Sequence, residues 1–92
     1  MATPAAEEKA RRNKCNNILG KICSKSHPSL DAPLKAIAEA ITACGFSMEG
    51  GLYCGRKGDC KEKVGKNTWL VLQWYKLADH PNERWEVNAY VS

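Results

Sequence analysis

The chain has 92 residues, of which 43% are hydrophobic and 26% are charged, and its formal net charge is +4. This length provides for a single domain, and a chain so short buries only about 60–65% of its unfolded surface, which leaves little room for a deep substrate cavity. The composition is typical of a globular protein and argues against disorder of the whole chain. No segment approaches the roughly 20 apolar residues of a membrane span, so no membrane partner is expected.

The start of the chain and its cysteines indicate a reducing compartment. Residues 1–14 lack the apolar core of a secretory signal, and Glu7 and Glu8 are atypical of a mitochondrial presequence. The five cysteines are an odd number, so they cannot all pair within one chain. Both features favour free thiols and an intracellular protein, in the cytoplasm or the nucleus.

A first helix is predicted from Thr3 and Pro4, which suit the N-cap and the first helical position, to His27, which precedes a proline. Its first ten residues are expected to fray. The apolar positions recur at helical spacing and form one face: Cys15, Ile18, Leu19, Ile22 and Cys23.

A second helix is predicted to begin at Asp31 as the capping residue, with Pro33 in its first turn. Gly45 follows the helix where a left-handed C-cap favours glycine. One face of this helix is apolar: Leu34, Ile37, Ala38, Ile41 and Cys44.

After Gly45 the periodicity changes to that of strands. A strand is predicted over Phe46–Cys54, interrupted by a turn or bulge at Gly50–Gly51, and residues 55–67 are interpreted as a mobile basic loop. Strands then follow over Trp69–Leu77 and Arg84–Val91, joined by a turn at residues 78–83.

Pairing the last two strands with Leu77 opposite Arg84 aligns their apolar positions in three pairs: Trp74 with Val87, Leu72 with Ala89, and Leu70 with Val91. These residues, with Trp85 on or beside them, are assigned to the core. The predicted fold is therefore α+β, with two N-terminal helices packed on one face of a three- or four-stranded antiparallel sheet.

The opposite sheet face mixes aromatic and polar side chains: Trp69, Val71, Gln73, Tyr75, Glu86, Asn88 and Tyr90. Three interpretations stay open. Another segment covers the face; a protein partner binds there, since Trp and Tyr dominate binding hot spots; or RNA or single-stranded DNA stacks on the aromatics. The candidate partner-binding residues are Trp69, Gln73, Tyr75, Asn88 and Tyr90.

Basic residues form two groups that could contact an anionic partner or simply be solvated. Arg11, Lys14, Lys21 and Lys25 fall within about 80° of one another on the first helix. Arg56, Lys57, Lys61 and Lys63 lie in the segment interpreted as a loop. No recognised nucleic-acid-binding motif accompanies them.

The cysteines divide into two groups. Cys15, Cys23 and Cys44 lie on apolar helix faces and are interpreted as buried thiols. Cys54 and Cys60 bracket basic residues that favour the thiolate, so they could be reactive or form a small disulfide. No closely spaced pair typical of a zinc site is present, and no metal is expected.

No motif of a catalytic site is found, and His27 and His80, which both precede prolines, are interpreted as solvated turn residues. We therefore expect no catalytic residue, no cofactor and no enzymatic activity. The sequence favours a protein-interaction module, an adaptor or accessory subunit, with nucleic-acid binding as the alternative and thiol redox activity third. A homo-oligomer is left open.

Overall fold

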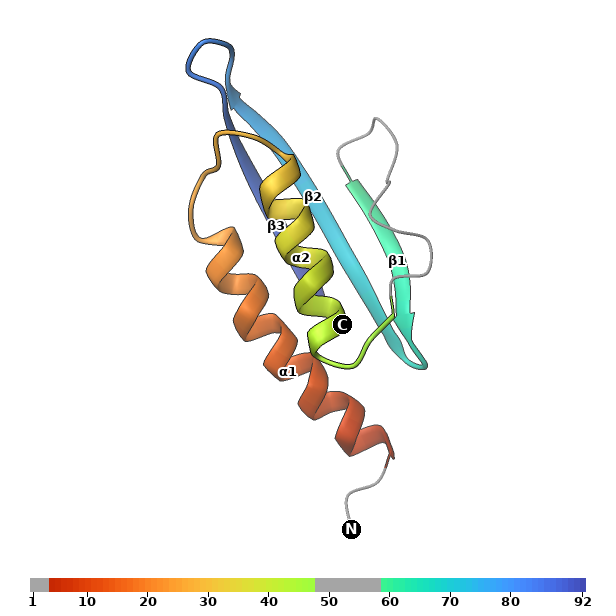
Figure 1. Ribbon diagram of the computed structural model, residues 1–92. Helices are drawn as coiled ribbons and strands as arrows, with labels where there is room; N and C mark the ends of the chain where they lie inside the picture. Colours follow the sequence, from red (N-terminus) through yellow and green to blue (C-terminus); the bar gives the residue numbers. More distant parts are fainter. Residues whose placement is uncertain (1–3, 48–58) are drawn as a thin grey trace.

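The computed structural model describes residues 4–47 and 59–92. Two helices are followed by three strands: α1 (Pro4–Cys23), α2 (Asp31–Ala43), β1 (Asp59–Gly65), β2 (Thr68–Ala78) and β3 (Arg84–Val91). The strands form an antiparallel sheet in the order β1-β2-β3, and both helices lie on one face of it (Figure 1). This arrangement confirms the predicted α+β fold with a three-stranded sheet.

The core lies between the helices and the sheet, as the two apolar helix faces predict. Cys15 and Leu19 of α1 and Ile37 and Ile41 of α2 are completely buried. Opposite them, the sheet contributes buried side chains at alternate positions: Val64, Leu70, Leu72, Val87, Ala89 and Val91.

Helix α1 ends at Cys23, a few residues before the predicted end at His27. The hydroxyl of Ser24 donates to the Lys21 carbonyl (2.8 Å), and Nε2 of His27 lies 3.0 Å from the Ile22 carbonyl oxygen. Because a carbonyl only accepts, Nε2 carries the hydrogen. Both contacts satisfy carbonyls of the last turn. His27 is therefore a half-buried structural residue, which corrects its interpretation as a solvated one, whereas His80 is exposed.

Helix α2 ends in a Schellman motif, which confirms the role predicted for Gly45. Gly45 has a φ of 87° and donates to Thr42, while Phe46 donates to Ile41. The predicted start is wrong in one detail: Leu30 is the N-cap, without a side-chain cap hydrogen bond, and Asp31 is the first helical residue. Asp31 is an exposed acidic residue in the first turn, so its negative charge instead interacts favourably with the positive end of the helix dipole.

Strand β1 contradicts the prediction of a loop over 55–67, because residues 59–65 pair with β2. Its sequence is mostly polar, and Val64 is its only buried residue among those whose side chains are described. The ladder with β2 therefore specifies this strand, rather than its own hydrophobic pattern. The expected strand over Phe46–Cys54 is not present at 46–47, although Ser47 donates to the Val64 carbonyl; the rest of it, with Gly50–Gly51, lies outside the described residues.

The predicted register of β2 and β3 is confirmed for its three apolar pairs. Near the hairpin it is wrong by one residue, because an irregularity between Lys76 and Ala78 places Ala78 opposite Arg84. Such a bulge turns Leu77 out of the ladder, and its side chain is 54% exposed.

Helix α1 and the segment after it also close the outer edge of β3. Asn16 bonds the main chain of Val91 twice: the Val91 N–H donates to Oδ1 (2.7 Å), and Nδ2 donates to the carbonyl (3.0 Å). The Ala89 N–H donates to Sγ of Cys23 at 3.2 Å. His27 exchanges two main-chain hydrogen bonds of 2.8 Å with Trp85. This edge is thereby unavailable as a template for another strand.

Candidate functional site

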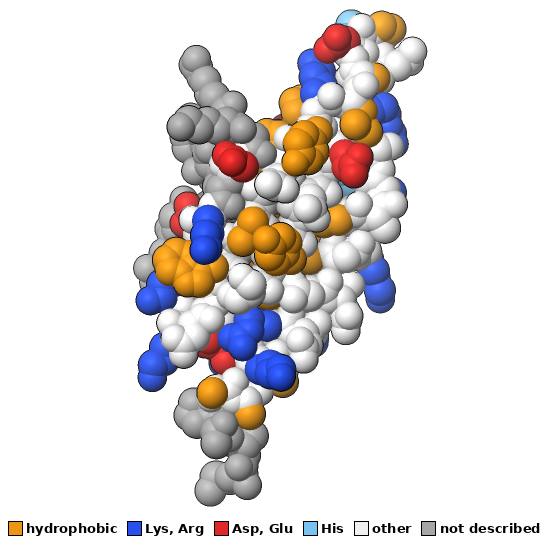
Figure 2. Space-filling view, turned by 180° about the vertical axis from the view of Figure 1, so that it is seen from behind, with side chains coloured by type: hydrophobic (Ala, Val, Ile, Leu, Met, Phe, Trp, Pro, Cys, Tyr) orange, Lys and Arg blue, Asp and Glu red, His pale blue; other side chains and the backbone are white. Residues whose placement is uncertain are grey.

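The outer face of the sheet, opposite the helices, carries the aromatic side chains that the alternation of β2 and β3 predicts. Trp69 is 39%, Tyr75 53% and Tyr90 45% exposed. Figure 2 views the molecule from this side and shows hydrophobic groups over the sheet, interspersed with polar and basic ones. None of the described segments buries these three aromatics.

Strand pairing arranges the outer face in rows, because residues directly opposite one another on neighbouring strands share a face. From one end to the other the rows are Lys63–Trp69, Lys61–Val71–Tyr90, Asp59–Gln73–Asn88 and Tyr75–Glu86. Trp69, Val71 and Tyr90 therefore occupy adjacent positions, which we call the aromatic cluster. Gln73 and Asn88 form a polar row between this cluster and Tyr75.

Two contacts join neighbouring side chains on this face. The Nζ of Lys61 lies 5.3 Å from the centre of the Trp69 ring, a distance typical of a cation–π interaction. The Tyr75 hydroxyl lies 3.4 Å from Oε1 of Gln73. Next to the cluster, a shallow hollow of about 340 Å³ is lined by Asp59, Lys61, Val71, Leu72 and Gln73. The five predicted partner-binding residues thus share one surface, on which a polar row separates the aromatic cluster from Tyr75.

Those predicted anion-contacting residues that the structure describes do not form one patch. Lys61 and Lys63 are exposed on β1 and lie in the rows of Val71 and Trp69. The residues of α1 lie in the helical layer on the opposite side of the sheet (Figure 1). Arg56 and Lys57 lie outside the described residues.

The basic stripe of α1 is itself divided. Arg11 lines a hollow near the start of the helix together with Lys66, Glu7 and Glu8, so two acidic side chains offset the two basic ones there. Lys14 is exposed. Lys21 and Lys25 border a different cavity at the other end of the helix.

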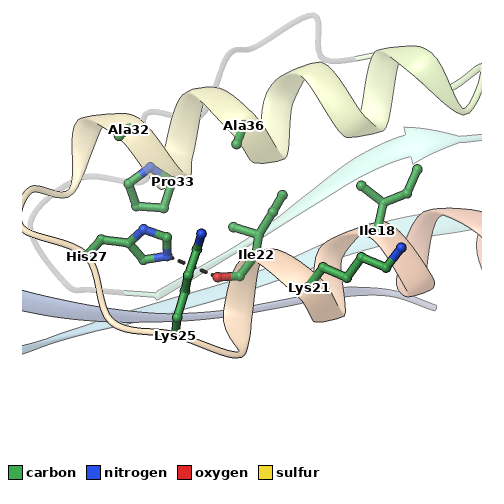
Figure 3. Close-up of a pocket in the computed structure, with 8 residues that line it drawn as sticks. All are labelled: Ile18, Lys21, Ile22, Lys25, His27, Ala32, Pro33 and Ala36. Carbon is green, nitrogen blue, oxygen red and sulfur yellow. Dashed lines mark hydrogen bonds between the residues drawn. The ribbon is translucent and has the colours of Figure 1, made fainter.

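That second cavity is a groove between the end of α1 and the start of α2, with a volume of about 390 Å³ (Figure 3). It is lined by Ile18, Lys21, Ile22, Lys25, His27, Ala32, Pro33 and Ala36. The sequence did not reveal it, because helical periodicity assigns Ile18 and Ile22 to the core. Both are only partly buried, and the remainder of their surface faces the groove. The one local signal was the pair of lysines that flanks this apolar stripe.

Cys15 and Cys23 are not activated thiols, because the pKa of each is raised. Burial, together with the neighbouring Cys44 thiol, raises the pKa of Cys15 to about 12. Burial also raises the pKa of Cys23, although a hydrogen bond with Ala89 opposes the shift. Cys15 and Cys44 are buried, as predicted, whereas Cys23 is only half-buried, which corrects the expectation of a buried thiol there. The predicted reactive pair cannot be placed, since Cys54 and the side chain of Cys60 lie outside the described residues.

Within residues 4–47 and 59–92, no three His, Cys, Asp or Glu side chains gather as a metal site would require. Neither helix in this part of the chain combines the length and the apolar character needed to cross a bilayer. Comparisons of the chain with protein-family models, curated proteins and solved structures found no match. We therefore base the functional inference on surface chemistry.

Proposed function

We propose that this chain is a non-enzymatic protein-interaction module, an adaptor or accessory subunit that binds a protein partner through the outer face of the sheet. The observation that supports this most directly is the exposure of Trp69 and Tyr90 on either side of Val71. Exposed aromatics on a rigid sheet offer a partner large contact area with few rotatable bonds, and such residues dominate binding hot spots. Gln73 and Asn88, in the row between the aromatic cluster and Tyr75, would supply hydrogen bonds to the partner.

The charge of this face favours a protein over a nucleic acid. Lys61 and Lys63 lie beside the aromatic cluster, but Asp59 and Glu86 occupy the same face and would repel phosphates. The other described residues that the sequence predicted to contact an anion belong to α1 and the segment just after it, on the other side of the sheet. A surface that combines exposed aromatic side chains with polar groups and charges of both signs suits a protein partner better than a polyanion.

RNA or single-stranded DNA binding is the second candidate, and the contact between Lys61 and Trp69 is the observation that favours it. A base stacked on Trp69 would displace Lys61 from the ring, and the freed ammonium could then contact a phosphate. This candidate predicts a steep loss of affinity with added salt.

Affinity capture from a cytoplasmic and nuclear lysate of the source organism tests the proposal. We expect the wild-type chain to retain a protein that Tyr90→Ser and Trp69→Ser fail to retain. Lys35→Ala, which alters an exposed residue of α2, serves as the control and should capture as the wild type does. Capture should survive nuclease treatment.

Equal capture by the wild type, Tyr90→Ser and Trp69→Ser would contradict the proposal. Loss of capture after nuclease treatment, together with a steep salt dependence, would instead support the nucleic-acid candidate.

A further inference from the structure

The groove between α1 and α2 presents two apolar walls of helical spacing. Ile18 and Ile22 lie one turn apart on α1, and Ala32 and Ala36 lie one turn apart on α2, with Pro33 between them (Figure 3). The small side chains of the α2 wall allow another backbone to approach closely. Two such rows form a trough into which the side-chain ridge of a third helix can pack.

The rim of this groove is positively charged. Lys21 and Lys25 border it on the α1 side, four residues apart, and the groove lining includes no acidic residue. Neither ammonium forms an ion pair with any described residue. Asp31 precedes Ala32 in the chain but does not line the groove.

From this combination we propose that the groove is a docking site for a short, acidic amphipathic helix of a partner protein. Apolar side chains of that helix would fill the trough between Ile22 and Ala36. Its carboxylates, one turn apart, would lie beside Lys21 and Lys25. Charge complementarity of this kind raises the association rate and selects against basic partners.

The groove lies in the helical layer, whereas the aromatic cluster lies on the opposite face of the sheet. Both surfaces can therefore be occupied at once, and the docking site does not depend on the proposed function of the outer face. A chain with two separate binding surfaces could connect two proteins.

A synthetic helical peptide provides the probe. It carries leucine at i, i+3, i+4 and i+7, glutamate at the flanking positions and a fluorescent label, and its binding to the full chain is followed by anisotropy. A second peptide with lysine in place of every glutamate is the control. We expect the acidic peptide to bind at least about tenfold more tightly than the basic one.

Variants of the chain then locate the binding. Ala32→Glu places a carboxylate on the groove wall in the first turn of α2, where acids stabilise a helix, so the fold should persist while affinity falls about tenfold. Lys21→Ser should weaken binding several-fold. Lys14→Ser, an exposed lysine of the same helix that does not line the groove, should have no effect. Thermal melts of each variant verify folding.

Several outcomes would overturn this assignment. The acidic peptide could bind no better than the basic one, bind Ala32→Glu as tightly as the wild type, or lose as much affinity with Lys14→Ser as with Lys21→Ser. Loss with Tyr90→Ser would place the peptide on the outer face instead. If the chain self-associates and Ala32→Glu abolishes this, the occupant is a second copy of the chain. If the chain binds phosphatidylserine vesicles and not the peptide, the occupant is a lipid surface.

Discussion

Two glycines of this chain occupy opposite environments. A Cβ added to Gly65 in β1 would lie 2.9 Å from Cδ1 of Phe46 and 3.2 Å from Cβ of Thr68, and both of these side chains are buried. A Cβ added to Gly20 in α1 would meet no atom within 4 Å. The absence of a side chain at Gly65 therefore lets Phe46 pack against the strand, whereas at Gly20 it serves no packing purpose.

These environments predict opposite effects of the same substitution. Gly65→Ala should lower the free energy of unfolding by about 1–3 kcal/mol, because the Phe46 ring must shift within a packed core. Gly20→Ala should raise it by about 0.5–1 kcal/mol, because alanine favours an exposed helix interior. Urea denaturation of both variants measures the difference, and stabilisation by Gly65→Ala would contradict the position of Phe46.

The raised pKa of Cys15, about 12, predicts a thiol that is almost entirely protonated near neutral pH. In the native, reduced protein, Cys15 and Cys44 should resist a maleimide reagent until the chain unfolds. Cys54 and Cys60 are predicted to react within minutes. Mass-spectrometric mapping of the labelled cysteines checks both statements, and rapid native labelling of Cys15 would refute its burial.

At the scale of elements, α1 does more than cover the sheet. Its Asn16 side chain takes the place of a neighbouring strand at Val91, satisfying an N–H and a carbonyl that would otherwise lack partners at the edge. Further along the same edge, Cys23 and His27 bond Ala89 and Trp85. The polar side chain on the helix thus determines where β3 lies against α1.

We expect Asn16→Ala to cost about 1–3 kcal/mol of stability, the usual penalty for leaving main-chain hydrogen-bonding groups unsatisfied. Asn17→Ala is the matched control, because Asn17 is exposed on the same helix, and it should change stability by less than about 0.5 kcal/mol. Chemical denaturation compares the two variants. Equal effects would show that the bonds to Val91 do not stabilise the edge.

Helix α1 is also joined to the β1–β2 turn through Glu8. Its carboxylate accepts the Asn67 N–H (2.8 Å) and pairs with Nη1 of Arg12 (3.2 Å), which in turn donates to Oγ1 of Thr68 (3.1 Å). Burial would raise the pKa of Glu8, but hydrogen bonds with Thr68 and the Asn67 main chain, and the charge of Arg12, together lower it below its ordinary value. The folded state therefore favours the ionised carboxylate.

A carboxyl group whose pKa is lower in the folded than in the unfolded chain stabilises the folded state at pH values above the ordinary pKa of glutamate. This stabilisation is lost as the pH falls through the lowered pKa of the folded state. Glu8→Gln should therefore destabilise the protein near pH 7 by more than it does near pH 3. Glu7→Gln, which alters the exposed neighbouring residue, is the matched control. Urea denaturation between pH 3 and pH 7 measures how the destabilisation by Glu8→Gln depends on pH. An effect that does not change with pH would contradict the lowered pKa of Glu8.

At the scale of the whole molecule, the sheet has one face packed under helices and one face open. Trp85 lies on the helix side near the hairpin, where its Nε1 donates to Glu83 (3.0 Å) and the Nζ of Lys76 lies 5.6 Å from its ring centre. It is half-buried, in agreement with its expected place beside the core, whereas Tyr75 and Tyr90 are exposed.

Replacing aromatics on the two faces should therefore have different consequences. Tyr75→Ser and Tyr90→Ser should each change stability by no more than about 1 kcal/mol, because little buried area is lost. Trp85→Ser should cost about 2 kcal/mol or more, since it removes a half-buried ring and its hydrogen bond to Glu83. Chemical denaturation of the three variants measures these changes. A loss of more than about 3 kcal/mol in the free energy of unfolding of both tyrosine variants would mean that the outer face is buried.

Local patterns in the sequence were sufficient to predict both helices, the end of α2 at Gly45 and the central register of β2 with β3. Each of these depends on residues close in the chain: helical spacing, a left-handed glycine, and alternation on both sides of a short turn. The same alternation identified the outer-face aromatics as one group of candidate binding residues.

Tertiary structure alone decided the remaining features. The polar segment 59–65 becomes a strand because β2 supplies its hydrogen-bonding partners, and its own sequence carries no apolar alternation from which to predict it. The groove and the closed β3 edge bring together segments that are apart in the chain: Ile22 and Ala36 line the same groove, and Asn16 bonds the main chain of Val91. Periodicity shows which face of a helix is apolar. How much of that face its neighbours cover depends on how the elements pack, and this is why part of the α1 face stays open as a groove.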